Sequence, residues 1–315
     1  MGNCAGYCQT GGQTTSDEVN GNNPATFKVN QDSIEAAIKV NKQQEEKARA
    51  MITKATRNPD YTSSYQQNDQ KKVERGGRVT KSPITLDSEA IYEGEWLGEM
   101  RDGFGKQVWP DGSKYEGEWR QDKANGKGKL IHADGDVYEG NWVDDKANGF
   151  GTYTHANGAR YQGDWKDDKQ DGQGHETWPD GAVYDGQYQD GKKHGRGKLV
   201  FADGSVYEGE FCMNEIQGSG VYSWSDNKKY SGEWLNNKMH GEGHLIWPDG
   251  KQYIGSFQED KRHGEGRFIW KDGREYTGGW VQGKQSGIGY YSNNKGERKK
   301  GVWKDGKRQS WLEEV

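Results

Sequence analysis

Large apolar and polar side chains alternate in short stretches along the chain from Ile91 onward. In the first stretch, Tyr92, Gly94 and Trp96 alternate with two glutamates. Alternate side chains share one face of a β-strand, so the pattern predicts a strand with rings on one face and carboxylates on the other. The leading tyrosine then returns every 23 residues, at Tyr92, Tyr115, Tyr138, Tyr161, Tyr184, Tyr207, Tyr230, Tyr253 and Tyr276. A fixed period of this length predicts a tandem array of small repeats.

A second strand follows in every repeat. With the leading tyrosine as offset 0, glycine occupies offsets 2, 11 and 13 of all nine repeats, and a large ring usually occupies offset 17. Aromatic residues stand at offset 4, namely Trp96, Trp119, Trp142, Trp165, Tyr188, Phe211, Trp234, Phe257 and Trp280. Asp-Gly at offsets 19 and 20 of most repeats is a hairpin signal, and we expect positive φ at both turn centres. The predicted fold is all-β, an elongated single-layer antiparallel ribbon of hairpins that contact mainly their neighbours.

The glycines inside the strands call for an explanation, because glycine normally weakens a strand. Paired glycines opposite rings leave room for the rings to lie flat against the sheet. We therefore expect Gly195→Val to disturb two neighbouring repeats, since a side chain there would collide with the packed rings.

The array resembles the MORN family, the membrane occupation and recognition nexus. The motif is visible as residues 115–119 (YEGEW), then Gly126-Lys127-Gly128, then Asp134-Gly135. The resemblance implies a curved, grooved, single-layer β-structure, often self-associating, that contacts proteins or lipids; a homodimer is one such expectation. Nine repeats fill residues 91–298, and residues 299–315 read as a degenerate capping repeat and tail. Asn227 replaces a turn glycine and Lys299 replaces the tenth tyrosine.

The segment before the array is polar and divides into four stretches. Residues 1–10 are a candidate acylated anchor, 11–31 are expected to be disordered, 32–58 are a possible helix, and 59–90 are a linker. Ser33 is a plausible N-cap of that helix. A solvated helix is the favoured interpretation, and a helix that binds a calmodulin-like partner is the alternative. Basic residues of the linker could contact anionic lipid, although an ordinary charged linker is favoured.

The first eight residues carry a candidate lipidation signal. Gly2 follows the initiator Met, as N-myristoylation requires, but Gly6 stands where the usual pattern has Ser or Thr. Cys4 is close enough for palmitoylation, and Cys8 could add another chain. Two acyl chains give stable membrane anchoring where one does not. The alternatives are unmodified thiols in an ordinary terminus and a metal site at Cys4 and Cys8, which no nearby His or third Cys supports.

Charge and composition narrow the partner classes. The whole chain has a formal net charge of −5 and three cysteines. The first 91 residues hold 12 basic and 11 acidic side chains, so the array carries the acidic excess. An acidic array is a poor candidate for binding nucleic acid through its bulk charge. No apolar run approaches the length of a membrane span. These features predict a reducing, cytoplasmic setting. The candidate lipidation signal predicts the cytoplasmic face of a membrane, and the resemblance to the MORN family implies the cytoskeleton or a cilium as the alternative.

Motifs that resemble catalytic sites follow the repeat instead. Gly-x-Gly recurs in every repeat and precedes a predicted strand, whereas a phosphate loop needs a helix N-terminus. His240 and His244 have metal-ligand spacing but fall on a predicted strand, and Cys212 stands where other repeats vary. We therefore expect no catalytic residues, no cofactor and no metal, and we expect the protein not to be an enzyme.

Partner binding is predicted on the aromatic face, because a single-layer ribbon cannot bury every ring against itself. An extended peptide or amphipathic helix would fit such a groove. The candidate groove residues are Trp119, Trp142, Trp165, Trp178, Trp224, Trp234, Trp247 and Trp270. Acidic residues recur at offsets 1 and 3 and lysines at offset 8, and the favoured interpretation is that both are solvated rows.

The predicted function is a membrane-anchored scaffold that binds protein partners at a membrane–cytoskeleton junction. One alternative is a phosphoinositide-binding module that uses Lys146, Lys169 and Lys192. Others are a structural component of a cilium or flagellum and an accessory subunit of a separate kinase.

Overall fold

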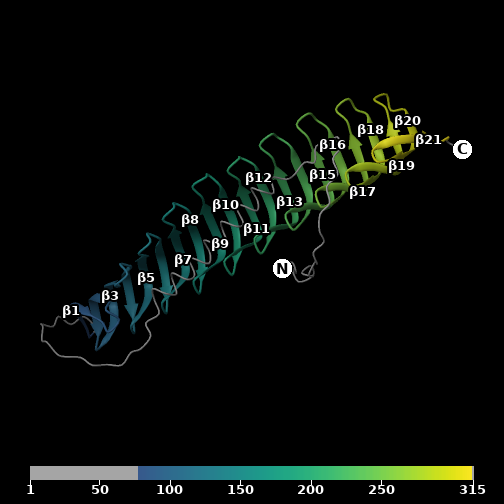
Figure 1. Ribbon diagram of the computed structural model, residues 1–315. Helices are drawn as coiled ribbons and strands as arrows, with labels where there is room; N and C mark the ends of the chain where they lie inside the picture. Colours follow the sequence, from purple (N-terminus) through teal and green to yellow (C-terminus); the bar gives the residue numbers. More distant parts are fainter. Residues whose placement is uncertain (1–76, 314–315) are drawn as a thin grey trace, which may run out of the picture. The chain divides into compact units, whose positions relative to one another are not determined.

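The computed structural model describes residues 77–313, which form 21 β-strands and no helix. Figure 1 shows the strands as a succession of hairpins in chain order. The described residues belong to two compact parts. The N-terminal part comprises residues 77–214 and 222–225, and the C-terminal part comprises residues 215–221 and 226–313. The expected all-β fold built of antiparallel hairpins is confirmed.

Short and long strands alternate in both parts. The N-terminal part contains β1 (Arg78–Thr85), β2 (Ile91–Leu97), β3 (Met100–Val108), β4 (Lys114–Arg120), β5 (Lys123–Ile131), β6 (Val137–Val143), β7 (Lys146–Thr154), β8 (Arg160–Lys166), β9 (Lys169–Thr177), β10 (Val183–Gln189), β11 (Lys192–Val200) and β12 (Val206–Cys212). β13 (Glu215–Ser223) has residues in both parts. The C-terminal part continues with β14 (Lys229–Leu235), β15 (Lys238–Ile246), β16 (Gln252–Gln258), β17 (Lys261–Ile269), β18 (Glu275–Val281), β19 (Lys284–Ser292), β20 (Arg298–Lys304) and β21 (Lys307–Trp311).

The leading tyrosine of each repeat lies across two glycines. A Cβ built on Gly105 would lie 2.1 Å from Tyr92 Oη, and one on Gly94 would lie 2.6 Å from the same atom. The Tyr92 hydroxyl donates to Glu95 O at 3.0 Å, and all nine leading tyrosines make the equivalent bond. Of the paired glycines at offsets 11 and 13, the one at offset 13 makes room for a ring as expected, and the glycine at offset 2 makes room for the same ring.

The glycine at offset 11 has a different reason to be glycine. Gly195 has φ +66, and a Cβ built on it would lie 2.0 Å from Gln187 Oε1. The expectation that a side chain there would collide with packed rings is wrong. The β10–β11 register slips between Gly186 and Tyr188, so the chain bulges at this point and needs a residue that tolerates left-handed backbone.

The Asp-Gly turn is a hairpin turn, as expected, but not of the expected type. Gly112 has φ +89, whereas Asp111 is not among the residues with positive φ. Trp109 N donates to Ser113 O at 2.9 Å and Gly112 N to Trp109 O at 3.0 Å. This is a three-residue loop that ends in a left-handed glycine. The Asp111 carboxylate accepts Ser113 N at 2.9 Å, which explains the aspartate.

The turn with two left-handed residues occurs at the other end of the strands. Gln121 has φ 49 and Asp122 has φ 65, and they join β4 to β5. A two-residue turn with positive φ at both centres matches the twist of the flanking strands. Aspartate and asparagine dominate these positions because they tolerate that backbone.

The N-terminal boundary of the array differs from the expected linker, whereas the C-terminal boundary contains a tenth hairpin where a degenerate capping repeat was expected. β1 (Arg78–Thr85) pairs with β2, so a strand occupies part of the expected 59–90 linker. At the other boundary β20 and β21 form a tenth hairpin, and Trp303 is buried beside Tyr276 at 4.8 Å between ring centroids. Asn227 has φ 69, as its replacement of a turn glycine required.

The expected anchor, disordered stretch and helix, residues 1–10, 11–31 and 32–58, lie outside the described residues, as do Gly2, Cys4 and Cys8. Among residues 77–313 there is no helix long and apolar enough to cross a membrane.

Candidate partner-binding surface

Tyrosine and tryptophan rings interlock from one repeat to the next. The Tyr92 ring meets Trp96 of its own repeat edge-on at 5.2 Å and Trp119 of the next at 5.4 Å. The same alternation runs through Tyr115 and Tyr138. The Trp119 indole Nε1 also donates to Gly105 O of the preceding repeat at 3.2 Å. Each ring pair therefore joins neighbouring repeats through edge-to-face packing and a backbone hydrogen bond.

Five of the eight predicted groove tryptophans are buried, so the expectation that they are exposed is wrong. They are Trp119, Trp142, Trp165, Trp234 and Trp247, each at most 9 % exposed. Long side chains at offset 9 of the preceding repeat provide part of the cover. The Arg101 guanidinium lies 4.3 Å from the Trp119 ring centroid, and Arg262 lies 4.2 Å from that of Trp280. The sheet thus covers its own rings with flanking rings and stacked cations.

The other three, Trp178, Trp224 and Trp270, are partly exposed. All three stand at offset 17, beside the three-residue turn. Trp224 packs on Tyr222 at 4.6 Å and Trp270 on Phe268 at 4.8 Å, so each is held by a ring at offset 15. We call Trp178 and Trp224, both in the N-terminal part, the ring row. Trp270 occupies the equivalent offset in the C-terminal part. Partner contact at the ring row stays a prediction.

A buried ion pair supports Trp178. Lys193 Nζ lies 3.0 Å from Glu176 Oε2, which also accepts the Tyr188 hydroxyl at 2.7 Å. Lys193 Nζ is 4.8 Å from the Trp178 ring centroid. Burial raises the pKa of Tyr188 well above its usual value, and the Glu176 carboxylate raises it further. All three residues are at most 6 % exposed, so their visible role is to position the ring above them.

This buried cluster was not identified from the sequence, although a signal was present. Offset 15 is apolar in most repeats, as in Leu130 and Leu199, and Glu176 breaks that row. Offset 9 varies from repeat to repeat, with Arg101, Ala124 and Lys193 among its residues, so Glu176 is the clearer signal. An acid on the ring face beside a lysine at offset 9 of the next repeat points to a pair.

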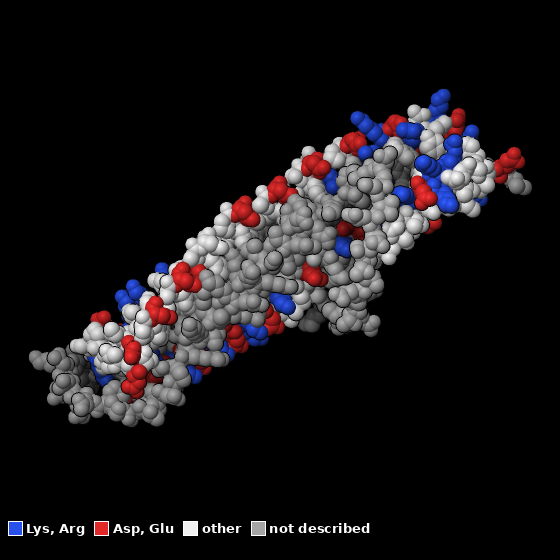
Figure 2. All heavy atoms as spheres, in the orientation of Figure 1, with Lys and Arg blue, Asp and Glu red and all other residues white. Residues whose placement is uncertain are grey.

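The acidic rows have structural partners on the outer face, the face opposite the rings. At offset 1, acids alternate with lysines of the next strand, so that Glu93 faces Lys106, which also faces Glu116. At offset 3, Glu118 Oε1 accepts the N–H of Lys127 at the bulge, at 3.1 Å. Figure 2 shows acidic and basic side chains interspersed along the visible surface of both parts. These carboxylates thus neutralise cations and cap bulges.

The lysines at offset 8 also have acidic neighbours. Lys146 Nζ lies 3.2 Å from Asp167 Oδ1, and Lys169 Nζ lies 2.8 Å from Asp190 Oδ1. In each pair the acid belongs to the two-residue turn of the following repeat. The lysine row is therefore partly neutralised where it would meet an anionic ligand.

The second residue of the two-residue turn joins neighbouring repeats. Asp145 Oδ1 accepts Ala124 N and Asp168 Oδ1 accepts Ala147 N, both at 2.7 Å. Burial raises the pKa of both carboxyls to about 6, against the lowering effect of these hydrogen bonds. Asn214 accepts Lys193 N at 2.7 Å in the equivalent place, so an uncharged amide oxygen performs the same role.

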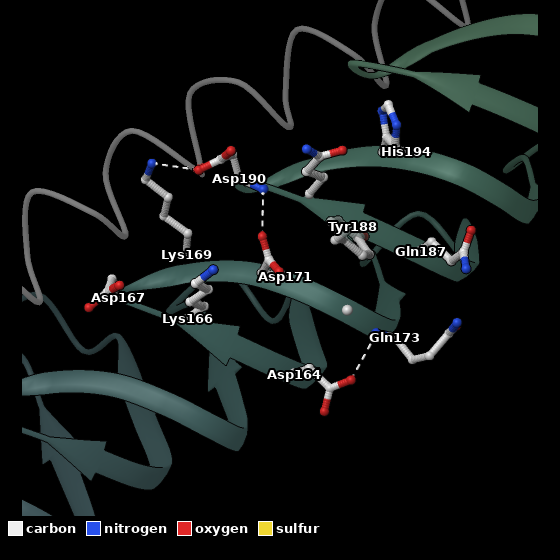
Figure 3. Close-up of a pocket in the computed structure, with 12 residues that line it drawn as sticks. Asp164, Lys166, Asp167, Lys169, Asp171, Gln173, Gln187, Tyr188, Asp190 and His194 are labelled. Atoms are coloured by element: carbon white, nitrogen blue, oxygen red, sulfur yellow. Dashed lines mark hydrogen bonds and ion pairs between the residues drawn. The ribbon is translucent and has the colours of Figure 1, made fainter. Parts of the chain in front are cut away.

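A surface pocket of about 600 Å³ opens beside two of these turns (Figure 3). It is lined by Asp164, Lys166, Asp167, Lys169, Asp171, Gly172, Gln173, Gln187, Tyr188, Gln189, Asp190 and His194. Asp164 Oδ2 accepts Gln173 N at 2.9 Å, and Asp171 Oδ2 accepts Asp190 N at 3.1 Å. Its carboxylates are therefore occupied with backbone amides and lysines.

The motifs set aside in the sequence fall where the repeat places them. His244 lies on β15 with its Nε2 2.9 Å from Gln252 Oε1, and Cys212 is a partly exposed residue at the end of β12. Within residues 77–313, no group of three His, Cys, Asp or Glu side chains is placed to hold a metal ion. Each Gly-x-Gly lies within a strand, as in β3 and β5.

Comparison with known proteins identifies the repeat. Nine consecutive segments match the family model described as the MORN repeat, namely residues 92–114, 115–137, 138–160, 161–183, 184–206, 207–229, 230–252, 253–273 and 276–298. No curated protein sequence matches the chain at a significant level.

Two similar solved structures are TCP domains. One is the TCP domain of SAS-4 (dCPAP) of Drosophila melanogaster in complex with a proline-rich motif of Ana2 (dSTIL), at 13% identity and a TM-score of 0.32 over 61% of this chain and 99% of that one. The other is a point mutant of the TCP10 domain of Danio rerio CPAP, at 13% identity and a TM-score of 0.34 over 69% and 96%. At these TM-scores the likeness carries no argument about this chain.

Proposed function

The chain belongs to the MORN-repeat family, and from this premise we propose that it is a non-enzymatic, membrane-anchored scaffold at a membrane–cytoskeleton junction. Acyl groups on Gly2 and Cys4, with Cys8 as a further site, hold it at the cytoplasmic face of a membrane. The array then presents the ring row to protein partners.

The observation that carries the proposal is the partial exposure of the ring row beside tryptophans that the sheet buries. Trp178 and Trp224 stay partly exposed, whereas Trp142 and Trp165 are at most 4 % exposed. Large, rigid aromatic side chains at the surface are preferred anchors for protein partners. The buried ion pair beneath Trp178 fixes that ring, which lowers the ordering cost of binding.

The ring row is tested by comparing the full chain with a Trp178→Ala, Trp224→Ala double variant. We expect partners that co-purify with the wild type to be lost, while the variant keeps the wild-type location. A Glu116→Ala, Glu139→Ala variant is the matched control, because it changes two exposed outer-face residues. Equal partner recovery from the ring-row variant and the wild type would remove the support for this surface.

The anchor is tested at Gly2 and Cys4. We expect the N-terminal peptide of the wild type to carry acyl mass, and Gly2→Ala and Cys4→Ser to release the protein from membranes. An unmodified Gly2 with an unchanged distribution would instead leave the array to determine location, as in a ciliary or cytoskeletal component.

Phosphoinositide binding through the array is the weaker candidate. Lys146 and Lys169 each have a carboxylate within 3.2 Å, so a lipid phosphate would compete with an existing ion pair. We expect Lys146→Ala, Lys169→Ala, Lys192→Ala to leave membrane location intact. Loss of vesicle binding in this triple variant, with Gly2 intact, would favour the lipid module.

A further inference from the structure

Cations of the last hairpin differ from those in the rest of the sheet. Elsewhere several cations pair with carboxylates, as Lys129 Nζ does with Glu139 Oε2 at 3.3 Å. Among the ion pairs of the described residues, none involves the cations of β20 and β21, which are Arg298, Lys299, Lys300, Lys304, Lys307 and Arg308. Asp305 is the one acidic residue between them. Figure 2 shows these basic side chains gathered where Figure 1 draws β20 and β21.

Aromatic rings hold these cations on both faces of the hairpin. Arg308 lies 4.2 Å from the Trp311 ring centroid, and Trp311 packs against the buried Trp303 at 6.1 Å. Arg298 lies 4.0 Å from the Tyr290 ring centroid. Tyr290 and Lys300 are cross-strand partners on the outer face. A segment lying beside the hairpin would therefore meet positive charge on each face.

β21 offers an edge for pairing. All five of its residues are exposed, and it pairs with β20 on one side. Within residues 77–313, the one strand register that includes β21 is with β20, and β3 pairs with β2 and β4. An open edge presents backbone N–H and C=O groups that an extended segment can bind. The β1 edge differs, because it contains Pro83 and its Arg78 lies 2.7 Å from Asp102 Oδ1.

The pairing rule of the sheet indicates the chemistry of the missing neighbour. Lys146 and Lys169 each stand at offset 8 of a long strand, and they lie 3.2 Å and 2.8 Å from an aspartate in the turn of the following repeat. Lys307 is the offset-8 lysine of β21 and has no ion pair among the described residues. Opposite charges on neighbouring strands stabilise a sheet. The strand that best continues β21 is acidic and extended.

We propose that the outer edge of β21 binds an acidic, extended peptide segment of a partner protein as one more antiparallel strand. Backbone hydrogen bonds supply affinity, and the cations on the two faces select glutamate or aspartate at consecutive positions. This edge is separate from the ring row, so the two surfaces can be tested independently.

The test measures binding of a labelled twelve-residue probe, three repeats of Glu-Glu-Thr-Val, to the full chain by fluorescence anisotropy. We expect saturable binding that weakens at least tenfold in an Arg298→Glu, Lys300→Glu, Arg308→Glu variant. A Lys114→Glu, Arg120→Glu, Lys166→Glu variant has the same net charge, changes exposed residues that do not face an acid across the sheet, and should bind within twofold of the wild type. Equal thermal unfolding midpoints of the two variants exclude a folding defect.

Strand addition is separated from bulk charge by a second probe with the same glutamates and proline at each threonine. Proline cannot donate to a ladder, so we expect at least tenfold weaker binding. Slower amide hydrogen exchange in residues 307–311 should accompany the first probe only. Equal binding of both probes, equal binding by the last-hairpin variant, or binding of phosphatidylserine vesicles without the peptide would each overturn the proposal.

Discussion

Two classes of glycine in each repeat stay small for different physical reasons. Gly105 lies beneath the Tyr92 ring, where a Cβ would be 2.1 Å from the hydroxyl oxygen. Gly112 has φ +89 with no atom within 4 Å of a Cβ. The first residue is limited by packing and the second by backbone conformation.

Replacing each of these glycines with alanine should separate the two effects. Gly105→Ala is expected to lower the free energy of unfolding by about 3 kcal/mol, since the ring must leave its place. Gly112→Ala should lower it by about 1 kcal/mol, the cost of left-handed backbone for alanine. Urea unfolding followed by tryptophan fluorescence measures both. Equal losses would contradict the packing argument.

The turn aspartates predict a pH dependence. Burial raises the pKa of Asp145 and Asp168 to about 6, above the usual value near 3.9, so the folded state favours the neutral acid. The stability that these two buried acids contribute is fully present below about pH 3.9, which is the pKa of aspartate in the unfolded chain. It is lost as the pH rises through about 6, the pKa in the folded chain. Raising the pH from 5 to 7.5 should therefore cost about 1 kcal/mol for each carboxyl.

An Asp145→Asn, Asp168→Asn variant should lack this loss, because Asn214 already accepts a backbone N–H at the equivalent position. We compare the free energy of unfolding of the variant with that of the wild type at each pH. The difference, variant minus wild type, should be about 2 kcal/mol larger at pH 7.5 than at pH 5. Unfolding at the two pH values measures this. A constant difference between the two proteins would show that the carboxyls do not titrate in this range.

At the scale of the element, the β9–β11 region carries a buried ion pair that neighbouring repeats lack. Removing one partner of such a pair leaves a buried charge, whereas replacing both with apolar residues is often neutral. The repeats themselves supply the replacements, since Leu130 and Ala124 occupy the positions of Glu176 and Lys193.

We expect Lys193→Ala to lower the free energy of unfolding by about 3 kcal/mol. The double variant Glu176→Leu, Lys193→Ala should lie within about 1 kcal/mol of the wild type. Urea unfolding of the three proteins provides the comparison. Additive losses in the double variant would mean that the two side chains act independently.

The strands that recur in every repeat could be predicted from the sequence, because a single repeat contains the residues that specify them. The alternation in residues 92–96 correctly predicted the strand and the face that carries its rings. The glycine at Gly105 correctly predicted that a ring lies close against the strand. The sequence analysis assigned the two-residue turn to the Asp-Gly end of the strands, whereas the structure has it at the other end. Asp-Gly does not distinguish the two, because it fits both a two-residue turn and a three-residue loop. β1 was missed because residues 78–85 lack the repeat's tyrosine and tryptophan. Exposure of the tryptophans was overestimated, since alternation assigns a side chain to a face but does not show that Arg101 covers Trp119.

At the scale of the whole molecule, the recurring contacts join each repeat to its neighbours. The rings, the turn aspartates and the ladder each connect one repeat to the next. Stability in such arrays is approximately a sum of repeat and nearest-neighbour terms. Any internal repeat should therefore be removable if the period is kept.

Deleting residues 138–160, one whole repeat, should give a folded chain, because Tyr115 would meet Trp165 in place of Trp142. Deleting residues 138–149 removes about half a repeat and reverses the order of strands and turns. We expect circular dichroism per residue to match the wild type in the first deletion and to lose strand signal in the second. The two deletions behaving alike would contradict nearest-neighbour packing.

The central claim, that partners bind the ring row, is tested most directly by photo-crosslinking in cells. A photoreactive phenylalanine analogue is placed at Trp178 or Trp224, and at the outer-face positions Glu116 or Glu139 as controls. The account predicts that positions 178 and 224 capture the same partner and that the outer-face positions do not. Crosslinks from the outer face alone, or from neither face, would contradict it.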